Sequence, residues 1–214
     1  MNINSKSVRI LCYGDSNTWG YIPGTGERYE ASRRWTGLLQ KALGEGFEII
    51  EEGLNSRTTD IDDPVNEGKN GASYLKPCLQ AHYPLDIVII MLGTNDLKDR
   101  FARTPEQVAQ GIDMLLSIIH NFSFNYDKEL IVVLLSPPFV DESIAGVQEK
   151  YRNAEEKSKQ LAELYKKIAE KYHCAFINIA QYVKPSKTDG YHLDPEAHKK
   201  IAEVLADKIK TIYH

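Results

Sequence analysis

The sequence has 214 residues, of which 42% are hydrophobic and 26% are charged. These proportions are ordinary for a globular protein and exclude a disordered or fibrous chain. The formal net charge of -4 argues against a nucleic-acid-binding domain, which usually carries a basic balance or a basic face. We expect one domain over residues 1–214, a length that can bury a sizeable core.

The three cysteines, Cys12, Cys78 and Cys174, are widely spaced. No CxxC or Cys/His spacing of a zinc site is present, so we expect no metal. Free, buried thiols are favoured over one disulfide, which stays open as an alternative, and free thiols are typical of a reducing compartment. No signal-peptide core follows the short polar N-terminus, and no apolar run approaches the ~18 residues of a membrane span. We expect a cytoplasmic protein with no membrane association, with export by another route left open.

Apolar runs alternate with amphipathic stretches along the chain. Five of these runs predict buried strands, at residues 8–13, 47–51, 86–92, 130–135 and 175–179. Continuous apolar strands are typical of a parallel sheet that is covered on both faces.

Four stretches predict helices that cover this sheet. Residues 35–43 form the first, which Gly44 and Gly46 end. The other three show apolar residues at helical spacing, and two of them begin at a Pro-Glu pair, a helix-start signal. Their apolar stripes are Val108, Ile112, Leu115, Leu116 and Ile119; Val147, Tyr151, Ala154, Leu161, Tyr165 and Ile168; and Ala197, Ile201, Val204, Leu205 and Ile212.

Alternating strands and helices predict a three-layer α/β domain. Two long irregular stretches remain, at residues 55–74 and 137–146. Both follow strands, where open α/β sheets place their binding sites.

Ser16 follows the first predicted strand, after Gly14 and Asp15. A serine at the carboxyl end of a central strand lies over the crevice of the sheet, and the glycine permits a tight turn. If a helix starts here, backbone N–H groups near Ser16 face the group that its oxygen attacks. Asp and Ser are also common N-caps with no chemistry. The GxSxG pattern of a nucleophile elbow and the GxGxxG pattern of a dinucleotide site are both absent.

The second and third strands end in residues that suit the same crevice. Gly53 offers a backbone N–H that a substrate oxygen can approach closely. Asn95 offers an amide donor that can stabilise an oxyanion without bringing a proton of its own. Gly, Asn and Asp are also ordinary residues of strand-ending turns, so residues 93–96 alone do not establish a site.

A candidate base stands before the last predicted helix. Asp189 and His192 are three residues apart, and a tight loop can bring the carboxylate to one imidazole nitrogen. The other nitrogen is then free to take the proton of Ser16. A loop hydrogen bond or a metal site is the alternative, but no second histidine follows at i+4. We interpret His198 as solvated or as packing, and the remaining histidines as structural: His82, His120, His173 and His214.

Four blocks therefore occur in a set order: residues 14–16, Gly53, residues 93–96 and residues 189–192. Together they resemble the SGNH (GDSL-type) hydrolases. The resemblance implies a flavodoxin-like three-layer α/β/α sandwich with a parallel five-stranded sheet and no cofactor. It also implies that Ser16 is the nucleophile, that His192 is the base and that Asp189 orients it. The implied oxyanion hole consists of the Ser16 N–H, the Gly53 N–H and the Asn95 side chain.

A closer resemblance, to the arylesterase/acyltransferase subgroup, rests on residues 14–21, 34–37, 51–54, 57–59, 70–75 and 91–96. It places Asp15, Asn17, Trp19 and Tyr21 at the substrate pocket. Asn17 stands where the subgroup carries Leu, and Tyr21 stands where Trp is usual, and both departures count against acyl transfer. Members of the subgroup tend to form oligomers, so a homo-oligomer is implied. Residues 139–170 do not align with the subgroup.

These patterns predict a serine esterase that hydrolyses short-chain acyl esters, acetyl to butyryl, of an aryl, alkyl or sugar alcohol. We expect it to bind a small-molecule ester substrate and to bind neither nucleic acid nor a membrane. Acyl transfer to an alcohol is expected as a weaker side activity. One alternative is a non-catalytic carbohydrate- or ligand-binding module on the same fold, which a degenerate triad would favour. Another is a flavodoxin-like nucleotide binder, which the missing phosphate loop disfavours.

Overall fold

The computed structural model describes residues 7–125 and 129–213. A five-stranded parallel sheet with the order β2-β1-β3-β4-β5 forms its middle layer. The strands are β1 (Val8–Gly14), β2 (Phe47–Gly53), β3 (Ile87–Met91), β4 (Ile131–Ser136) and β5 (Ala175–Asn178). All five predicted strands are therefore confirmed, with ends that shift by one or two residues, and the three-layer architecture is confirmed with them.

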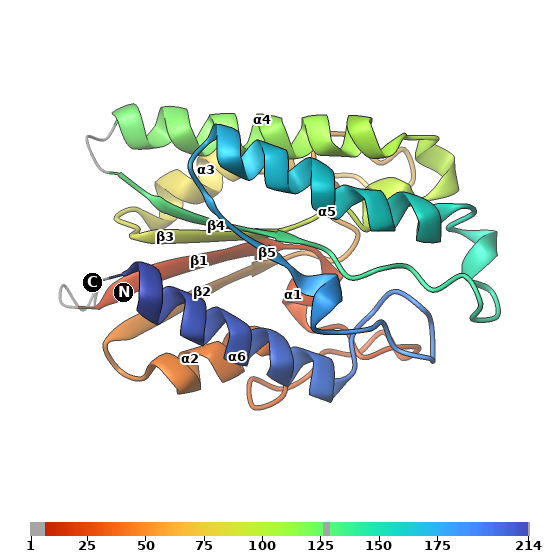
Figure 1. Ribbon diagram of the computed structural model, residues 1–214, viewed down its shortest axis with the longest axis horizontal. Helices are drawn as coiled ribbons and strands as arrows, with labels where there is room; N and C mark the ends of the chain where they lie inside the picture. Colours follow the sequence, from red (N-terminus) through yellow and green to blue (C-terminus); the bar gives the residue numbers. More distant parts are fainter. Residues whose placement is uncertain (1–6, 126–128, 214) are drawn as a thin grey trace.

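Helices cover both faces of the sheet (Figure 1). On one face lie α2 (Trp35–Leu43) and α6 (Pro195–Ile212), and on the other lie α3 (Gly71–His82), α4 (Pro105–Asn125) and α5 (Ala154–Lys171). The four-residue helix α1 (Ser16–Trp19) stands at the carboxyl end of β1. Short 3-10 helices occupy Asn95–Leu97, Asp99–Phe101, Val147–Glu149 and Ile179–Gln181.

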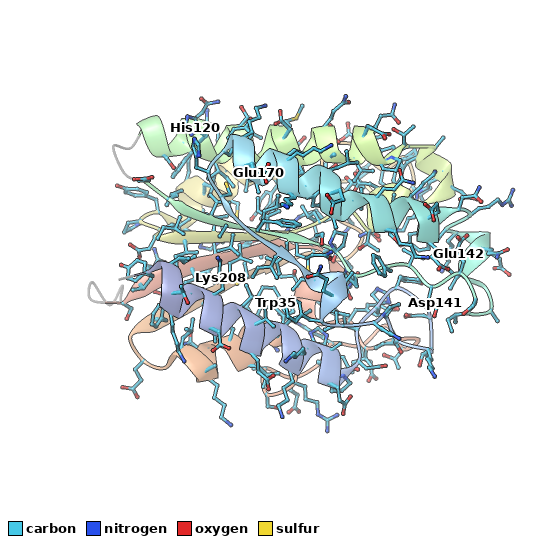
Figure 2. All side chains as sticks on the ribbon, in the orientation of Figure 1. Trp35, His120, Asp141, Glu142, Glu170 and Lys208 are labelled. Carbon is cyan, nitrogen blue, oxygen red and sulfur yellow. The ribbon has the colours of Figure 1, made fainter. Side chains whose placement is uncertain are left out.

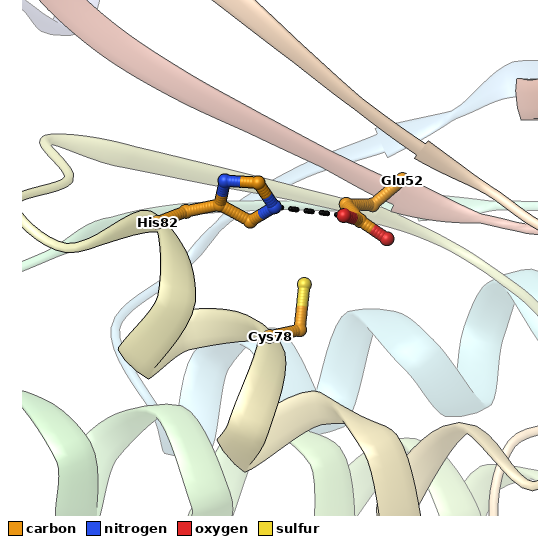
Figure 3. Close-up of side chains that lie close together, drawn as sticks. All are labelled: Glu52, Cys78 and His82. Carbon is orange, nitrogen blue, oxygen red and sulfur yellow. Dashed lines mark hydrogen bonds and ion pairs between the residues drawn. The ribbon is translucent and has the colours of Figure 1, made fainter. Parts of the chain in front are cut away.

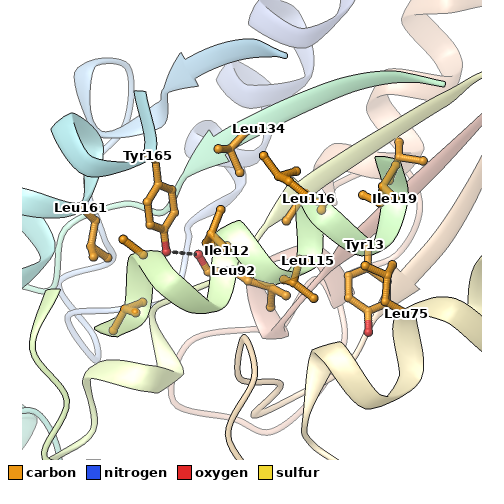
Figure 4. Close-up of a cluster of buried hydrophobic side chains, with 14 of the residues drawn as sticks. Tyr13, Leu75, Leu92, Ile112, Leu115, Leu116, Ile119, Leu134, Leu161 and Tyr165 are labelled. Carbon is orange, nitrogen blue, oxygen red and sulfur yellow. Dashed lines mark hydrogen bonds between the residues drawn. The ribbon is translucent and has the colours of Figure 1, made fainter. Parts of the chain in front are cut away.

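Each face of the sheet has its own apolar core. The stripe of α4, with Ile112, Leu116 and Ile119, packs against Leu134 of β4 in the larger core (Figure 4). Tyr165 of α5 is fully buried there and satisfies its hydroxyl by donating to the carbonyl of Leu92 at 3.0 Å. Burying a leucine or isoleucine side chain, as in this stripe, stabilises the folded state by roughly 1.5–3 kcal/mol, so the stripe holds α4 on the sheet.

Trp35 belongs to the second core, between α2, α6 and the sheet (Figure 2). Only 1% of it is exposed, and its indole N–H donates to the carbonyl of Asn17 at 3.1 Å. His198 of α6 is also buried and accepts the backbone N–H of Trp35 at 3.2 Å. The packing interpretation of His198 is therefore confirmed.

The prediction of one helical stripe from Val147 to Ile168 is wrong in its first part. Val147 begins a 3-10 helix, and α5 starts only at Ala154. Left-handed backbone at Asn153 separates the 3-10 helix from α5. The carboxylate of Glu142 accepts the N–H groups of Asn153 and Glu155 and so caps the start of α5.

Helix α3 was not assigned from the sequence, and its first turn falls within the stretch predicted to be irregular. Pro77 lies in its interior, where it removes one backbone donor and obscures the helical pattern. The side chain of Asn70 caps the helix by accepting the N–H of Ser73 at 3.3 Å. The other stretch, residues 137–146, is irregular as predicted, and Figure 2 shows its Asp141 and Glu142 at the end of the molecule where the strands finish.

All three cysteines are free, as expected. Cys12 and Cys78 are buried, whereas Cys174 is partly exposed. Within the described residues, no helix combines the length and the apolar character that crossing a membrane requires.

Candidate active site

The site lies where the chain direction across the sheet reverses. The chain runs from β1 to β2 on one side and then returns to β3 on the other side of β1. Ser16 follows β1 and Asn95 follows β3, so both stand at this switch point, where doubly wound sheets bind their ligands.

A tight turn presents Ser16 as the first residue of α1. The carboxylate of Asp15 caps α1 by accepting the N–H of Asn17 at 2.9 Å. A Cβ atom at Gly14 would lie 2.0 Å from the hydroxyl of Thr18 and 2.9 Å from the carbonyl of Met91, so only glycine fits. The sequence-predicted turn is present, and it leaves Ser16 only 7% exposed.

The three residues of the predicted triad form one hydrogen-bonded chain. The Oγ of Ser16 lies 3.0 Å from Nε2 of His192, and Nδ1 of His192 lies 2.7 Å from Oδ2 of Asp189. Residues 16 and 192 reach each other only through the fold, because they lie far apart in the sequence. This is the order of contacts in which a serine hydroxyl can pass its proton to an oriented imidazole.

The loop that carries Asp189 and His192 is held rigidly. The second carboxylate oxygen of Asp189 accepts the N–H of His192 at 3.1 Å. Gly190 has a φ of 76°, and a Cβ atom there would lie 2.6 Å from the carbonyl of Asp141. Burial raises the pKa of Asp189, but its hydrogen bonds and the charge of His192 outweigh burial and hold the pKa below its ordinary value. Asp189 is therefore ionised at neutral pH.

A hollow of about 240 Å³ opens in front of Ser16. Polar and aromatic side chains line it, and Tyr21 stacks on His192 at its edge. The lining residues are Ser16, Tyr21, Asn55, Ser56, Asn66, Asn95, Lys98, Arg100, Lys150, Tyr151, Tyr191 and His192.

Asn95, the predicted side-chain donor of the oxyanion hole, lines this hollow. Its amide donates one proton to the carbonyl of Arg57 at 3.1 Å, which fixes the side chain and leaves the second proton for the hollow. The next residue, Asp96, is fully buried and accepts the N–H and hydroxyl of Thr59 and the guanidinium of Arg103. These bonds anchor the end of β3 and thereby position Asn95.

The assignment of Gly53 to the oxyanion hole is not supported. Leu54 donates its N–H to Gly14 of β1, so in the alternating ladder the N–H of Gly53 points away from the sheet. A Cβ atom at Gly53 would lie 2.2 Å from the backbone nitrogen of Trp19. Gly53 is therefore required for the close packing of α1 on β2, and it does not line the hollow.

Ser56 is the residue that stands in the expected place. It lines the hollow and has a φ of 66°, a left-handed conformation that is uncommon outside glycine. Within the described residues, the N–H groups of Ser56 and Ser16 have no hydrogen-bond partner. A signal for Ser56 in the sequence would have required its backbone angle, which residue type alone does not reveal.

Three of the four predicted pocket residues do not line the hollow. Asp15 is buried as the cap of α1, and the amide of Asn17 is turned away to donate to the carbonyl of Tyr191 at 3.0 Å. Trp19 packs under the guanidinium of Arg28, 5.3 Å from its ring centre. Only Tyr21 borders the hollow, as predicted.

His82, predicted from the sequence to be structural, lies against Glu52 and Cys78 in the fold. Its Nε2 lies 2.7 Å from Glu52, and the thiol of Cys78 completes a set of donors within 4.8 Å of one another (Figure 3). Zinc uses such donors, but His82 and Glu52 satisfy each other here. Burial, and then the charge of Glu52, raise the pKa of the Cys78 thiol to about 12. We interpret the cluster as a contact that fixes α3 to β2.

The model of the GDSL-like Lipase/Acylhydrolase family matches residues 12–200. The inhibitor-bound aryl esterase of M. smegmatis is 37% identical, with a TM-score of 0.91, covering 96% of this chain and 100% of that one. The carbohydrate acetylesterase Est24 from Sinorhizobium meliloti is 36% identical, with a TM-score of 0.91, covering 97% and 100%. A putative arylesterase from Agrobacterium tumefaciens is 34% identical, with a TM-score of 0.87, covering 96% and 99%. A search of curated proteins gave no match.

Proposed function

The chain belongs to the GDSL-like lipase/acylhydrolase family and is a carboxylic ester hydrolase, and we propose from this premise that it cleaves short-chain acyl esters through an acyl-serine at Ser16. The observation that carries the proposal is the chain of contacts from Ser16 Oγ to His192 Nε2, at 3.0 Å, and from Nδ1 to Asp189, at 2.7 Å.

In the first half of the reaction, His192 Nε2 takes the hydroxyl proton as Ser16 Oγ bonds to the ester carbonyl carbon. The carbonyl oxygen becomes an oxyanion, which the N–H groups of Ser16 and Ser56 and the amide of Asn95 stabilise. The imidazolium then gives its proton to the departing alcohol oxygen, leaving the acyl-serine. The ionised Asp189 holds the tautomer and stabilises the imidazolium. In the second half, His192 takes a proton from water as the water oxygen bonds to the acyl carbon. The second oxyanion then collapses, the imidazolium returns the proton to Ser16 Oγ as the acyl–oxygen bond breaks, and the acid is released.

The hollow and the relatives both support a proposal for the substrate class. Those relatives are described as arylesterases and a carbohydrate acetylesterase, so we propose an acetyl-to-butyryl ester of an aryl, alkyl or sugar alcohol. A hollow of about 240 Å³ has to hold both halves of the ester, which favours a short acyl chain.

We propose that transfer to an added alcohol is weaker than hydrolysis. The amide of Asn17 does not support this, because it is turned away from the hollow. The support comes from the polar side chains of the lining, Asn55, Asn66 and Lys98, which offer hydrogen bonds to water.

The test is acyl-enzyme formation with p-nitrophenyl acetate. Ser16→Ala should abolish both turnover and the acetyl adduct detected by mass spectrometry while the fold is kept. The matched control is Ser117→Ala, which removes a hydroxyl from α4 and should leave both readouts unchanged. Turnover of Ser16→Ala near the wild-type rate would contradict the proposal.

A further inference from the structure

The charges around the hollow are of one sign. The charged side chains that line it are Lys98, Arg100 and Lys150, and among the residues that the structure describes no carboxylate lines it. The chain as a whole has a formal net charge of -4, so this positive surface is a local feature. A cleft lined by one sign of charge concentrates the field on a ligand of the opposite sign.

Lys98 is the innermost of these cations. It is half-buried directly after the 3-10 helix of Asn95, and within the described residues its ammonium group has no ion pair and no hydrogen bond. Burial, and then the nearby Arg100, lower the pKa of Lys98 to about 8. A cation that is held partly out of water without a partner is costly, and a bound anion would relieve that cost.

Neighbouring carboxylates do not cancel this charge. Asp15 is fully buried behind Ser16 and accepts the N–H of Asn17, and burial raises its pKa to about 7. Asp63 pairs with Arg100 and neutralises that residue in part. The exposed Lys150 has no carboxylate within ion-pair distance among the described residues. The balance at the hollow therefore stays positive.

The positions of these cations relative to Ser16 determine which half of the ester they contact. Arg100 and Lys150 are exposed and stand at the mouth of the hollow. The acyl carbon has to reach Ser16, which is 7% exposed, whereas the alcohol leaves toward solvent. We propose that the alcohol half of the natural ester carries a carboxylate or a phosphate, which Lys98, Arg100 and Lys150 bind. This inference rests on the proposed esterase function.

The test compares 4-acetoxybenzoate with its neutral methyl ester in wild type and in Lys98→Met, which keeps the aliphatic stem. The measured quantity is the ratio of kcat/KM for the anionic ester to kcat/KM for the neutral one. Comparing the ratio between proteins cancels the different reactivity of the two esters. We expect Lys98→Met to lower the ratio about tenfold and Lys98→Arg to restore it. The control Lys76→Gln removes an exposed charge on α3 and should leave the ratio unchanged.

Two further substrates show whether a phosphate can replace the carboxylate and which half of the ester has to carry the charge. An acetylated sugar phosphate should show the same dependence on Lys98, whereas monomethyl succinate, charged on its acyl half, should not. Raising the ionic strength from about 0.05 M to about 0.5 M should slow the anionic ester more than the neutral one.

Equal losses on both esters in Lys98→Met would overturn the inference, because they would indicate a general role at the site. A dependence confined to monomethyl succinate would overturn its assignment to the alcohol half. These outcomes differ from failure of the proposed function, in which Ser16→Ala would still hydrolyse the neutral ester.

Discussion

The phenol ring of Tyr21 stacks on the imidazole of His192, with ring centroids 4.1 Å apart and ring planes 23° apart. Stacking restricts the imidazole to the orientation that contacts Ser16, and an aromatic face stabilises a cation that forms beside it. Tyr21→Ala should therefore lower kcat about tenfold, whereas Tyr21→Phe should stay close to wild type. Steady-state kinetics on p-nitrophenyl acetate measure both, and an unchanged kcat in Tyr21→Ala would show that the contact is incidental.

Asn95 should act mainly in the transition state. Asn95→Ala removes a donor that is held toward the hollow, and such a loss typically lowers kcat about 10²–10³-fold with little change in KM. Asn66→Ala is the control, because it removes another amide that lines the same hollow. A change confined to KM would make Asn95 a residue that positions substrate.

The backbone N–H of Ser56, and not its hydroxyl, should contribute to catalysis. Ser56→Gly keeps the N–H and accepts the φ of 66° without strain, so its kcat should stay within about threefold of wild type. Ser56→Val places a β-branched residue in that conformation, which displaces the N–H, and its kcat should fall at least about tenfold. Circular dichroism checks that both variants fold, and equal activity of the two variants would remove Ser56 from the oxyanion hole.

His198 should make the protein less stable in acid. Burial lowers its pKa to about 3 from an ordinary 6.5, so between these values the unfolded chain binds the extra proton. The free energy of unfolding should then fall as the pH falls from 6.5 toward 3, by up to about 1.4 kcal/mol per pH unit from this group.

His198→Asn keeps an acceptor for the N–H of Trp35 but cannot protonate in this range. Urea unfolding at a series of pH values should give a shallower slope for the variant, although its stability at neutral pH is lower. Other groups titrate in both proteins, so the difference between the slopes isolates His198. Parallel slopes would show that His198 does not control the acid response.

Acyl length should follow the size of the hollow. Acetyl to butyryl p-nitrophenyl esters should be hydrolysed faster than octanoyl, since a hollow of about 240 Å³ also holds the alcohol half. With vinyl acetate and benzyl alcohol in buffer, acetate should exceed benzyl acetate, which chromatography measures directly. Faster cleavage of the octanoyl ester would contradict the narrow hollow, and predominant benzyl acetate at low alcohol would contradict the role of its polar lining.

The sequence was sufficient wherever a local pattern carries the information. Apolar runs located all five strands, because a strand covered on both faces needs apolar side chains along its length. The spacing of Asp189 and His192 predicted their contact, because three residues of tight loop restrict where the imidazole can lie. Motif order predicted that Ser16 joins them, and the fold does bring Ser16 to His192.

Tertiary structure decided what depends on the direction of a backbone group or side chain. Whether Gly53 or Ser56 faces the hollow follows from strand pairing and from one φ angle, and residue type does not encode either. The amide of Asn17 turns away because the carbonyl of Tyr191, distant in sequence, accepts its proton. Lys98 looks in the sequence like any solvated lysine. Only the packing around it leaves it partly buried at the hollow that Ser16 also lines, with no ion-pair partner among the described residues. Such properties arise from contacts between distant segments, which local periodicity cannot report.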